Sequence, residues 1–140
     1  MLSPGEPLPD WPGPTHRAAA DLPRTPHLLP FSNVNDAIGN IPPGFPLHNP
    51  DQVMRRDAIP YDGDLPLKNT ITTQGIMSYH PSGKRNFTTR ELACLQGVPF
   101  EHEFGPSGTR KQIGNMVPPI VAKIFFEHIK HALLKEDGLR

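Results

Sequence analysis

The segment 87–99 reads Phe-Thr-Thr-Arg-Glu-Leu-Ala-Cys-Leu-Gln-Gly-Val-Pro, and it determines where one helix begins and ends. Thr88 is followed three residues later by Glu91, the spacing at which each side chain accepts a hydrogen bond from the other residue's backbone N–H. Gly97, with a proline two residues later, is a typical C-terminal stop. The segment therefore predicts a helix over residues 89–96.

A second segment, residues 111–119, reads Lys-Gln-Ile-Gly-Asn-Met-Val-Pro-Pro and leads into the longest predicted helix. Pro118 and Pro119 suit the entry to a helix, where a missing N–H costs nothing. Beyond them, side chains recur at helical spacing down one face, namely Val121, Ile124, Phe125, His128 and Ala132. This helix is predicted to run to about Lys135.

Upstream of these segments the sequence predicts short elements separated by loops. Ser32 or Asn33 can cap a short helix that Gly39 ends. The run 70–73, Thr-Ile-Thr-Thr, is β-branched throughout and is the best strand candidate. A second short strand is expected near residues 76–79.

Proline dominates the N-terminal part, with eight of the 19 prolines before Phe31. This part has no helical or alternating period, so residues 1–30 are predicted to be linker-like and disordered. Only 36% of the 140 residues are hydrophobic, which leaves little material for a core. We expect a small folded part with irregular flanks.

The charges balance, with 14 Lys plus Arg against 14 Asp plus Glu. No whole-chain field therefore draws the protein to nucleic acid or to an anionic membrane, and any DNA contact has to be local. One cysteine cannot build a disulfide framework, which fits a reducing compartment. Neither a signal sequence nor a stretch of the ~20 apolar residues that span a bilayer is evident, so no membrane partner is expected.

Two short patterns that suggest phosphate or metal binding are incomplete. Gly83-Lys84 suggests the end of a phosphate-binding loop, but no glycine stands five residues before Gly83. Arg85 also stands where Ser or Thr would hold magnesium. His128 and His131 are three residues apart on the last predicted helix, but no third ligand is evident. No metal site is expected.

Residues 90–99 resemble the ninth conserved motif of DNA cytosine-5 methyltransferases: Arg-Glu, small residues, Leu-Gln-Gly, an apolar residue and Pro. Residues 111–119 resemble the tenth motif, usually Gln-Ile-Gly-Asn-Ala-Val-Pro-Pro. Upstream, residues 70–73 and the loop 80–85 match the end of the family's target-recognition region, most closely that of fungal members. The resemblance is close over residues 65–135 and weaker upstream.

The resemblance implies an α/β fold, as the C-terminal part of a Rossmann-like, S-adenosylmethionine-dependent methyltransferase. Residues 31–87 would end the small target-recognition region, and residues 88–136 would hold the ninth and tenth motifs with a long C-terminal helix. The implied activity is methyl transfer from S-adenosylmethionine to C5 of cytosine in DNA. The implied location is the nucleus.

The family's tenth motif lies beside the cofactor pocket, so the resemblance assigns Asn115 and Val117 to S-adenosylmethionine. An amide side chain suits that task because it offers donors and an acceptor at one position. The alternative is that Gly114 and Asn115 only form a turn before the last helix. Met116 replaces the usual alanine, and its flexible thioether can fill the same space.

Three residues are implied to meet DNA. Thr70 matches the threonine that holds the DNA backbone beside the flipped base, and a hydroxyl donates readily to a phosphate oxygen. Its alternative role is that of an ordinary β-branched strand residue. Lys84 and Arg85 form a compact basic loop that can meet phosphates, with solvated surface charge as an equal alternative.

No residue of the chain is assigned to catalysis. The family attacks a cytosine rotated out of the duplex with a cysteine thiolate, assisted by a glutamate. The Pro-Cys-Gln and Glu-Asn-Val motifs that supply these groups, and the glycine-rich cofactor loop, are not found. Cys94 lies in a predicted helix among apolar neighbours, whereas a nucleophilic cysteine needs an electropositive, partly exposed setting. Arg90 and Glu91 are expected to be architectural.

Three hypotheses follow. The chain is a fragment of a methyltransferase, inactive alone because its N-terminal catalytic half is missing. Alternatively, it is a non-enzymatic DNA- and cofactor-site module that complements a separately encoded half. A third possibility is a degenerate product without function.

Overall fold

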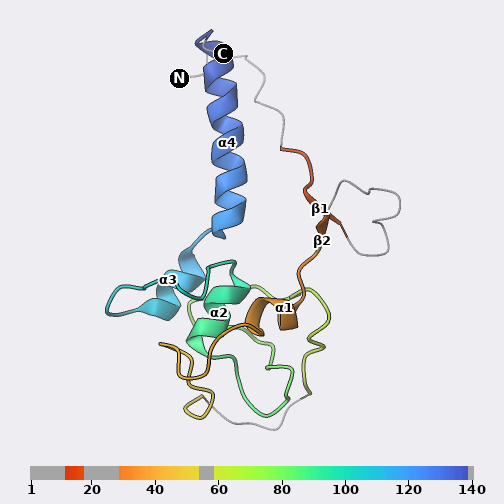
Figure 1. The fold of residues 1–140 in the computed structure, drawn as a ribbon, viewed down its shortest axis with the longest axis vertical. Coiled ribbons are helices and arrows are strands. Elements are labelled where there is room, and N and C mark those ends of the chain that lie inside the picture. Colours follow the sequence, from red (N-terminus) through yellow and green to blue (C-terminus); the bar gives the residue numbers. More distant parts are fainter. Residues whose placement is uncertain (1–11, 18–28, 54–58, 139–140) are drawn as a thin grey trace.

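The computed structural model describes residues 12–17, 29–53 and 59–138 of the chain. Three short helices and the loops around them form a small body, and one long helix extends away from it (Figure 1). In chain order the elements are β1 (His16–Arg17), β2 (Leu29–Pro30), α1 (Val34–Ile38), α2 (Thr89–Leu95), α3 (Thr109–Asn115) and α4 (Pro119–Glu136).

Helix α2 begins and ends as its sequence predicts. The Thr88 side chain accepts from the Glu91 N–H, and the Glu91 carboxylate accepts from the Thr88 N–H. At the other end Gly97 adopts a φ of 79°, and the Val98 N–H donates to the Ala93 carbonyl at 3.0 Å. A residue with a left-handed backbone lets the chain turn back on the last carbonyls, which is why glycine stands there.

Helix α1 confirms the short helix predicted between Ser32 and Gly39. The Asn33 side chain accepts from the Asp36 N–H at 2.7 Å, and Gly39 is the C-cap. The backbone N–H groups of the first turn also donate to a distant loop, with Val34 N–H 3.2 Å from the Leu65 carbonyl oxygen. These backbone hydrogen bonds therefore join the start of α1 to the loop around residues 63–65.

The two strands predicted at residues 70–73 and 76–79 are wrong. Thr72 and Gly75 instead close a tight turn, donating backbone N–H groups to each other's carbonyls at 2.7 and 2.9 Å. Gly75 has a φ of 110°, a conformation that extended strands do not use. The β-branched Ile71 is 5% exposed and packs in the core. Its apolar bulk serves core packing rather than a sheet ladder.

The strands that do form lie in the N-terminal part, which was expected to be linker-like. β1 and β2 pair in parallel, His16 opposite Leu29 and Arg17 opposite Pro30. Most of that prediction concerns residues 1–11 and 18–28, which lie outside the described part of the chain.

Helix α3 was not predicted, because its sequence lacks an apolar period. Gly108 precedes it with a φ of 68° and no side-chain cap. Ile113 is the one buried residue of α3, at 1% exposure. Ile113 is thus the one buried apolar side chain that α3 packs into the core, and one residue gives no periodic signal.

The core lies between α1, α2, α3 and the turn at residues 71–75. Its buried side chains are Val34, Ile71, Phe87, Leu92, Ala93, Val98 and Ile113. They come from segments spread over eighty residues of sequence, so the loops are held in place by the helices they cross. None of the helices in the described residues is long and apolar enough to cross a membrane.

Helix α4 confirms the long terminal helix and extends one residue beyond the predicted end. None of its residues is buried. Its exposed large apolar side chains are Ile120, Val121, Phe125, Phe126, Ile129 and Leu133. They form a broad apolar surface, and α4 also carries exposed charged side chains such as Lys123 and Glu127.

Candidate functional site

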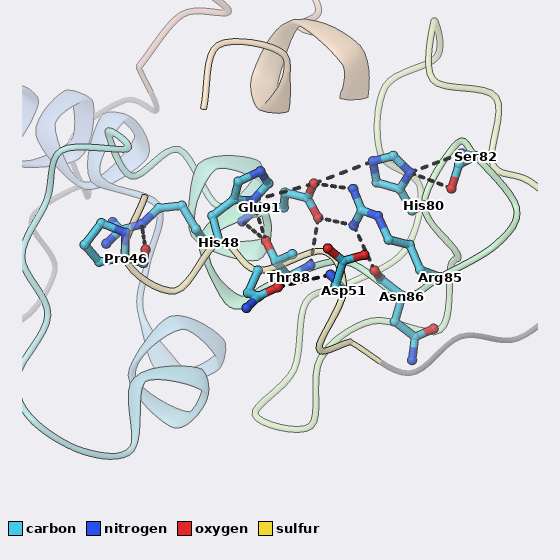
Figure 2. Close-up of polar contacts among 11 residues, drawn as sticks. Pro46, His48, Asp51, His80, Ser82, Arg85, Asn86, Thr88 and Glu91 are labelled. Carbon is cyan, nitrogen blue, oxygen red and sulfur yellow. Dashed lines mark hydrogen bonds and ion pairs between the residues drawn. The ribbon is translucent and has the colours of Figure 1, made fainter. Parts of the chain in front are cut away.

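The carboxylate of Glu91 is the centre of a buried polar cluster (Figure 2). Arg85 donates two hydrogen bonds to it, Nη1 to Oε2 and Nη2 to Oε1, both at 2.8 Å. Two imidazoles lie close by, His80 Nε2 at 3.6 Å and His48 Nδ1 at 3.9 Å from Oε1. Nδ1 of His48 also lies 3.0 Å from the hydroxyl of Thr88. Helix α2 is thereby tied to the loop before it and to the distant segment around residue 48.

The environment of Glu91 stabilises its ionised form. Burial by itself would raise the pKa of this carboxyl, but the hydrogen bonds from Arg85 and from the Thr88 N–H outweigh it. The positive charge of Arg85 acts in the same direction, and the net result is a lowered pKa. The Glu91 carboxylate therefore acts as a charged hydrogen-bond acceptor that connects Arg85 to the start of α2, rather than as a proton donor.

The two basic residues of the loop 80–85 have different surroundings. The side chain of Arg85 is 15% exposed, and it also donates to the Asn86 carbonyl at 3.1 Å. Lys84 is exposed, and its backbone N–H lies 3.4 Å from the Ser82 hydroxyl. Lys84 is thus an exposed residue of the loop, whereas Arg85 is engaged with Glu91.

Arg90 is a second buried cation, and its contacts were missed from the sequence. Its guanidinium lies 5.1 Å from the ring centroid of Phe45 and 5.3 Å from that of Phe104. It donates to the carbonyls of Pro46 and His102 at 3.1 and 2.8 Å. The partners stand more than ten residues away on either side, so only a search for aromatic pairs around a buried arginine could have found them.

Gly114 brings the end of α3 against the turn at residues 72–75. A Cβ placed on it would overlap the backbone of Thr72 and Thr73, lying 2.7 Å from the Thr72 carbonyl oxygen. This close approach requires glycine for lack of space, since the backbone of Gly114 is not in the left-handed region. The two segments that the sequence assigned to cofactor and to DNA are neighbours as a result.

Thr70 is exposed beside this contact. It lines a hollow of about 400 Å³ together with Asn69, Thr72, Gln74, Gly75, Ile76 and Met77. The hollow is lined by hydroxyl and amide side chains together with the apolar side chains of Ile76 and Met77. A polar backbone or a base edge could be accommodated there.

Asn115 is the last residue of α3, and Val117 lies on the short connection between α3 and α4. Asn115 is exposed, and none of the described residues forms a hydrogen bond with its side chain. Val117 is 61% exposed, and the intervening Met116 is held by its carbonyl, which accepts from Gln96 Nε2 at 3.1 Å. The segment is thus fixed by its backbone and leaves one amide and one apolar side chain available.

A groove of about 480 Å³ runs next to this segment, between α1, the end of α2 and the start of α4. Its lining includes Cys94, Leu95, Gln96, Pro118, Val121 and Ile124. Burial raises the pKa of the Cys94 thiol above its ordinary value, which disfavours the thiolate. In the described part of the chain, no group of three or more His, Cys, Asp or Glu side chains could hold a metal ion.

Comparison with known proteins gives a family match over residues 45–131, to the family described as C-5 cytosine-specific DNA methylase. DNA (cytosine-5)-methyltransferase 2 of Arabidopsis thaliana is 43% identical over 88 residues. Type II methyltransferase M.AquIB of Picosynechococcus sp. is 36% identical over 81 residues. Type II methyltransferase M.NgoFVII of Neisseria gonorrhoeae is 51% identical over 47 residues.

These matches cover unequal shares of the proteins. The plant match takes in 57% of this chain and 6% of the relative. The M.AquIB match takes in 46% of this chain and 57% of the relative, which is therefore itself a short chain. The M.NgoFVII match takes in 32% of this chain and 13% of the relative. No solved structure matches the chain significantly.

Proposed function

The chain belongs to the C-5 cytosine-specific DNA methylase family, and we propose that it forms part of a DNA (cytosine-5-)-methyltransferase. The family implies a Rossmann-like methyltransferase fold and the general reaction of methyl transfer to cytosine. In this proposal the chain provides the edge of the cofactor pocket and contacts to the DNA backbone. The groups that make and break bonds are provided by a catalytic half, and the chain alone is inactive.

The division of labour follows from the chemistry. A cytosine inside a duplex is stacked and cannot be attacked, so it has to be rotated into the enzyme and held there. S-adenosylmethionine supplies the methyl group when bound. The one cysteine of the chain, Cys94, stands in helix α2 and not in a Pro-Cys-Gln motif, and burial raises the pKa of its thiol, which supports a nucleophile supplied from elsewhere.

We propose that Asn115 and Val117 hold S-adenosylmethionine. The exposed amide of Asn115 has donors and an acceptor free among the described residues, and Val117 offers an apolar surface two residues later. This donor set fits a ligand that combines polar and apolar parts. Gln96 of α2's C-terminal end holds this segment by donating a hydrogen bond from Nε2 to the Met116 carbonyl.

We propose Thr70 and Lys84 as contacts to DNA phosphates, because both side chains are exposed. Arg85 donates to Glu91 through both terminal nitrogens and its side chain is 15% exposed, so it is less available to a phosphate than Lys84. The net charge of zero means that affinity depends on these local groups and not on a general field. The nucleus is the proposed location.

The observation that supports this proposal most is the packing of Gly114 on Thr72 and Thr73. It makes neighbours of the segment proposed for the cofactor and the segment proposed for DNA, as a methyl transfer between the two requires. The test is transfer of labelled methyl from S-adenosylmethionine to cytosine-containing DNA, by the chain alone and with a catalytic half. Activity of the chain alone would refute the proposed division of labour, and so would loss of reconstituted activity in Cys94→Ser.

A second candidate function is complementation of a separately encoded catalytic half. Two observations favour it: M.AquIB is a short chain named as a methyltransferase, and α4 leaves apolar side chains such as Phe126 and Leu133 exposed. A partner that covers this helix would remove the apolar surface from water. An independently expressed catalytic half would support complementation, and one continuous coding sequence would support a fragment.

A further inference from the structure

The loop 80–85 is folded around the imidazole of His80 (Figure 2). Nδ1 of His80 accepts from the backbone N–H of Ser82 at 3.1 Å, and the Ser82 hydroxyl lies 3.1 Å from the same nitrogen. The backbone closes the loop twice, His80 N–H to the Arg85 carbonyl at 3.1 Å and Gly83 N–H to the His80 carbonyl at 2.8 Å. Gly83 has a φ of 69°, which suits the tight return.

The hydrogen bonds of this ring fit one state of the imidazole. Because Nδ1 accepts from an N–H, the proton of the neutral ring stands on Nε2, which faces Glu91 Oε1 at 3.6 Å. The ring of Phe87 packs edge-on against it, with centroids 5.5 Å apart. A second proton on Nδ1 would remove the acceptor on which the Ser82 N–H depends.

Charged or titratable groups from three segments face the ring: Glu91 from α2, Arg85 from the loop itself and His48 from the segment before residue 50. Burial lowers the pKa of His80, Arg85 lowers it further, Glu91 opposes this and His48 adds a smaller lowering. Burial and Arg85 thus favour the neutral ring. The pKa of His80 is lower in the folded than in the unfolded state, so the unfolded state takes up the proton first as the pH falls. The contribution of the ring to loop stability is therefore present above the unfolded pKa and decreases as the pH drops from there through the folded pKa.

We propose that His80 is a positioning residue, whose neutral imidazole holds the loop 80–85 in the shape that presents Lys84 and whose protonation releases that loop. Arg85 takes part indirectly, by keeping Glu91 in place beside the ring. The role of Lys84 toward DNA rests on the proposed function, but the hold on the loop does not.

The loop itself is tested by an NMR pH titration of the full chain, following the His80 ring nitrogens and the amides of residues 82–84. The proton of the neutral ring is expected on Nε2, and the loop amides are expected to shift with the same midpoint as the ring, below its ordinary pKa. A proton on Nδ1, or amides that ignore the ring's titration, would overturn the proposal.

Two variants test whether the loop needs a hydrogen-bond acceptor at residue 80. In His80→Asn the side-chain oxygen can accept from the N–H two residues on at every pH, as in an Asx-turn, so the loop amides should stay near their neutral-pH positions throughout. In His80→Ala no acceptor remains, and the amides should resemble those of the acidified wild type at all pH values. If His80→Asn behaves like His80→Ala while the helix signal is intact, the acceptor role is wrong.

The link to DNA is tested by the salt dependence of binding to a labelled, cytosine-containing duplex. Loss of one phosphate contact lowers the slope of log K against log salt by about one, so Lys84→Ala and His80→Ala should each lower it by about that amount. The double variant should lower it no further. Additive effects would refute the positioning role. A wild-type chain without salt-dependent binding would refute the DNA contact in the proposed function, and the NMR titration would still decide the hold on the loop.

Discussion

Replacing Glu91 by alanine should cost about 3–5 kcal/mol of unfolding free energy, the range found when one partner of a buried ion pair is removed. The carboxylate accepts two hydrogen bonds from Arg85 at 2.8 Å and one from the Thr88 N–H at 2.7 Å. The side chains of Glu91 and Arg85 are 3% and 15% exposed, so little water is available to replace the lost partner. An exposed pair would contribute only about 0–1 kcal/mol, and burial is what makes the expected loss large.

Glu91→Gln separates charge from capping. The amide oxygen can still accept from the Thr88 N–H, so the expected loss is about 1.5–3 kcal/mol, the contribution of hydrogen bonds to a charged group. Glu103→Gln is the matched control, because Glu103 is exposed and such substitutions stay within about 0.5 kcal/mol. The assay is urea unfolding followed by far-UV circular dichroism, which reports the helices.

The lowered pKa of Glu91 adds a pH signature to the same experiment. A carboxyl with a lowered folded pKa contributes stability above its ordinary pKa and loses it as the pH falls through the folded value. The difference between wild type and Glu91→Gln should therefore shrink in acid. Equal stability of Glu91→Ala and Glu103→Gln at neutral pH, or a difference that does not change in acid, would refute this reasoning.

Three further outcomes are expected. Gly114→Ala should lose about 1–3 kcal/mol of unfolding free energy, because its Cβ overlaps the Thr72 backbone; Gly13→Ala, with open space around it, should not, and equal losses would contradict the close contact. With a catalytic half bound, Asn115→Ala should weaken S-adenosylmethionine binding about tenfold by calorimetry, from one lost hydrogen bond, and an unchanged Kd would remove it from the site. Phe126→Asp should leave unfolding within about 0.5 kcal/mol, since Phe126 is 70% exposed, yet abolish co-purification with a catalytic half; retained co-purification would show that α4 is not the contact.

The helices could be predicted where local chemistry decides them. Thr88 with Glu91 and the glycine at 97 fix both ends of α2, because these groups act within one turn of the chain. The paired prolines and the apolar spacing after them fix α4 in the same way. These signals are local, and the structure confirms them.

The remainder depends on contacts between distant residues. The Thr-rich run at 70–73 has strand propensity, but a turn closed by Gly75 and the burial of Ile71 decided its conformation. Helix α3 buries one apolar side chain, Ile113, and its last residues pack on a turn some forty residues earlier in the chain, so no local pattern marks it. For the candidate site, the sequence identified Lys84 and Arg85 together as basic residues. It could not show that Glu91 pairs with Arg85 and not with Lys84, since that depends on how α2 lies against the loop.

The central claim is that this chain completes a cytosine methyltransferase whose bond-making groups lie elsewhere. The most direct measurement is to titrate the chain into a fixed amount of a catalytic half that carries the Pro-Cys-Gln motif, and to measure methyl transfer from S-adenosylmethionine to C5 of cytosine in DNA. We expect no transfer by either partner alone and a rate that rises until one chain is present per catalytic half. Transfer by the chain alone, or a catalytic half whose rate the chain leaves unchanged, would contradict it.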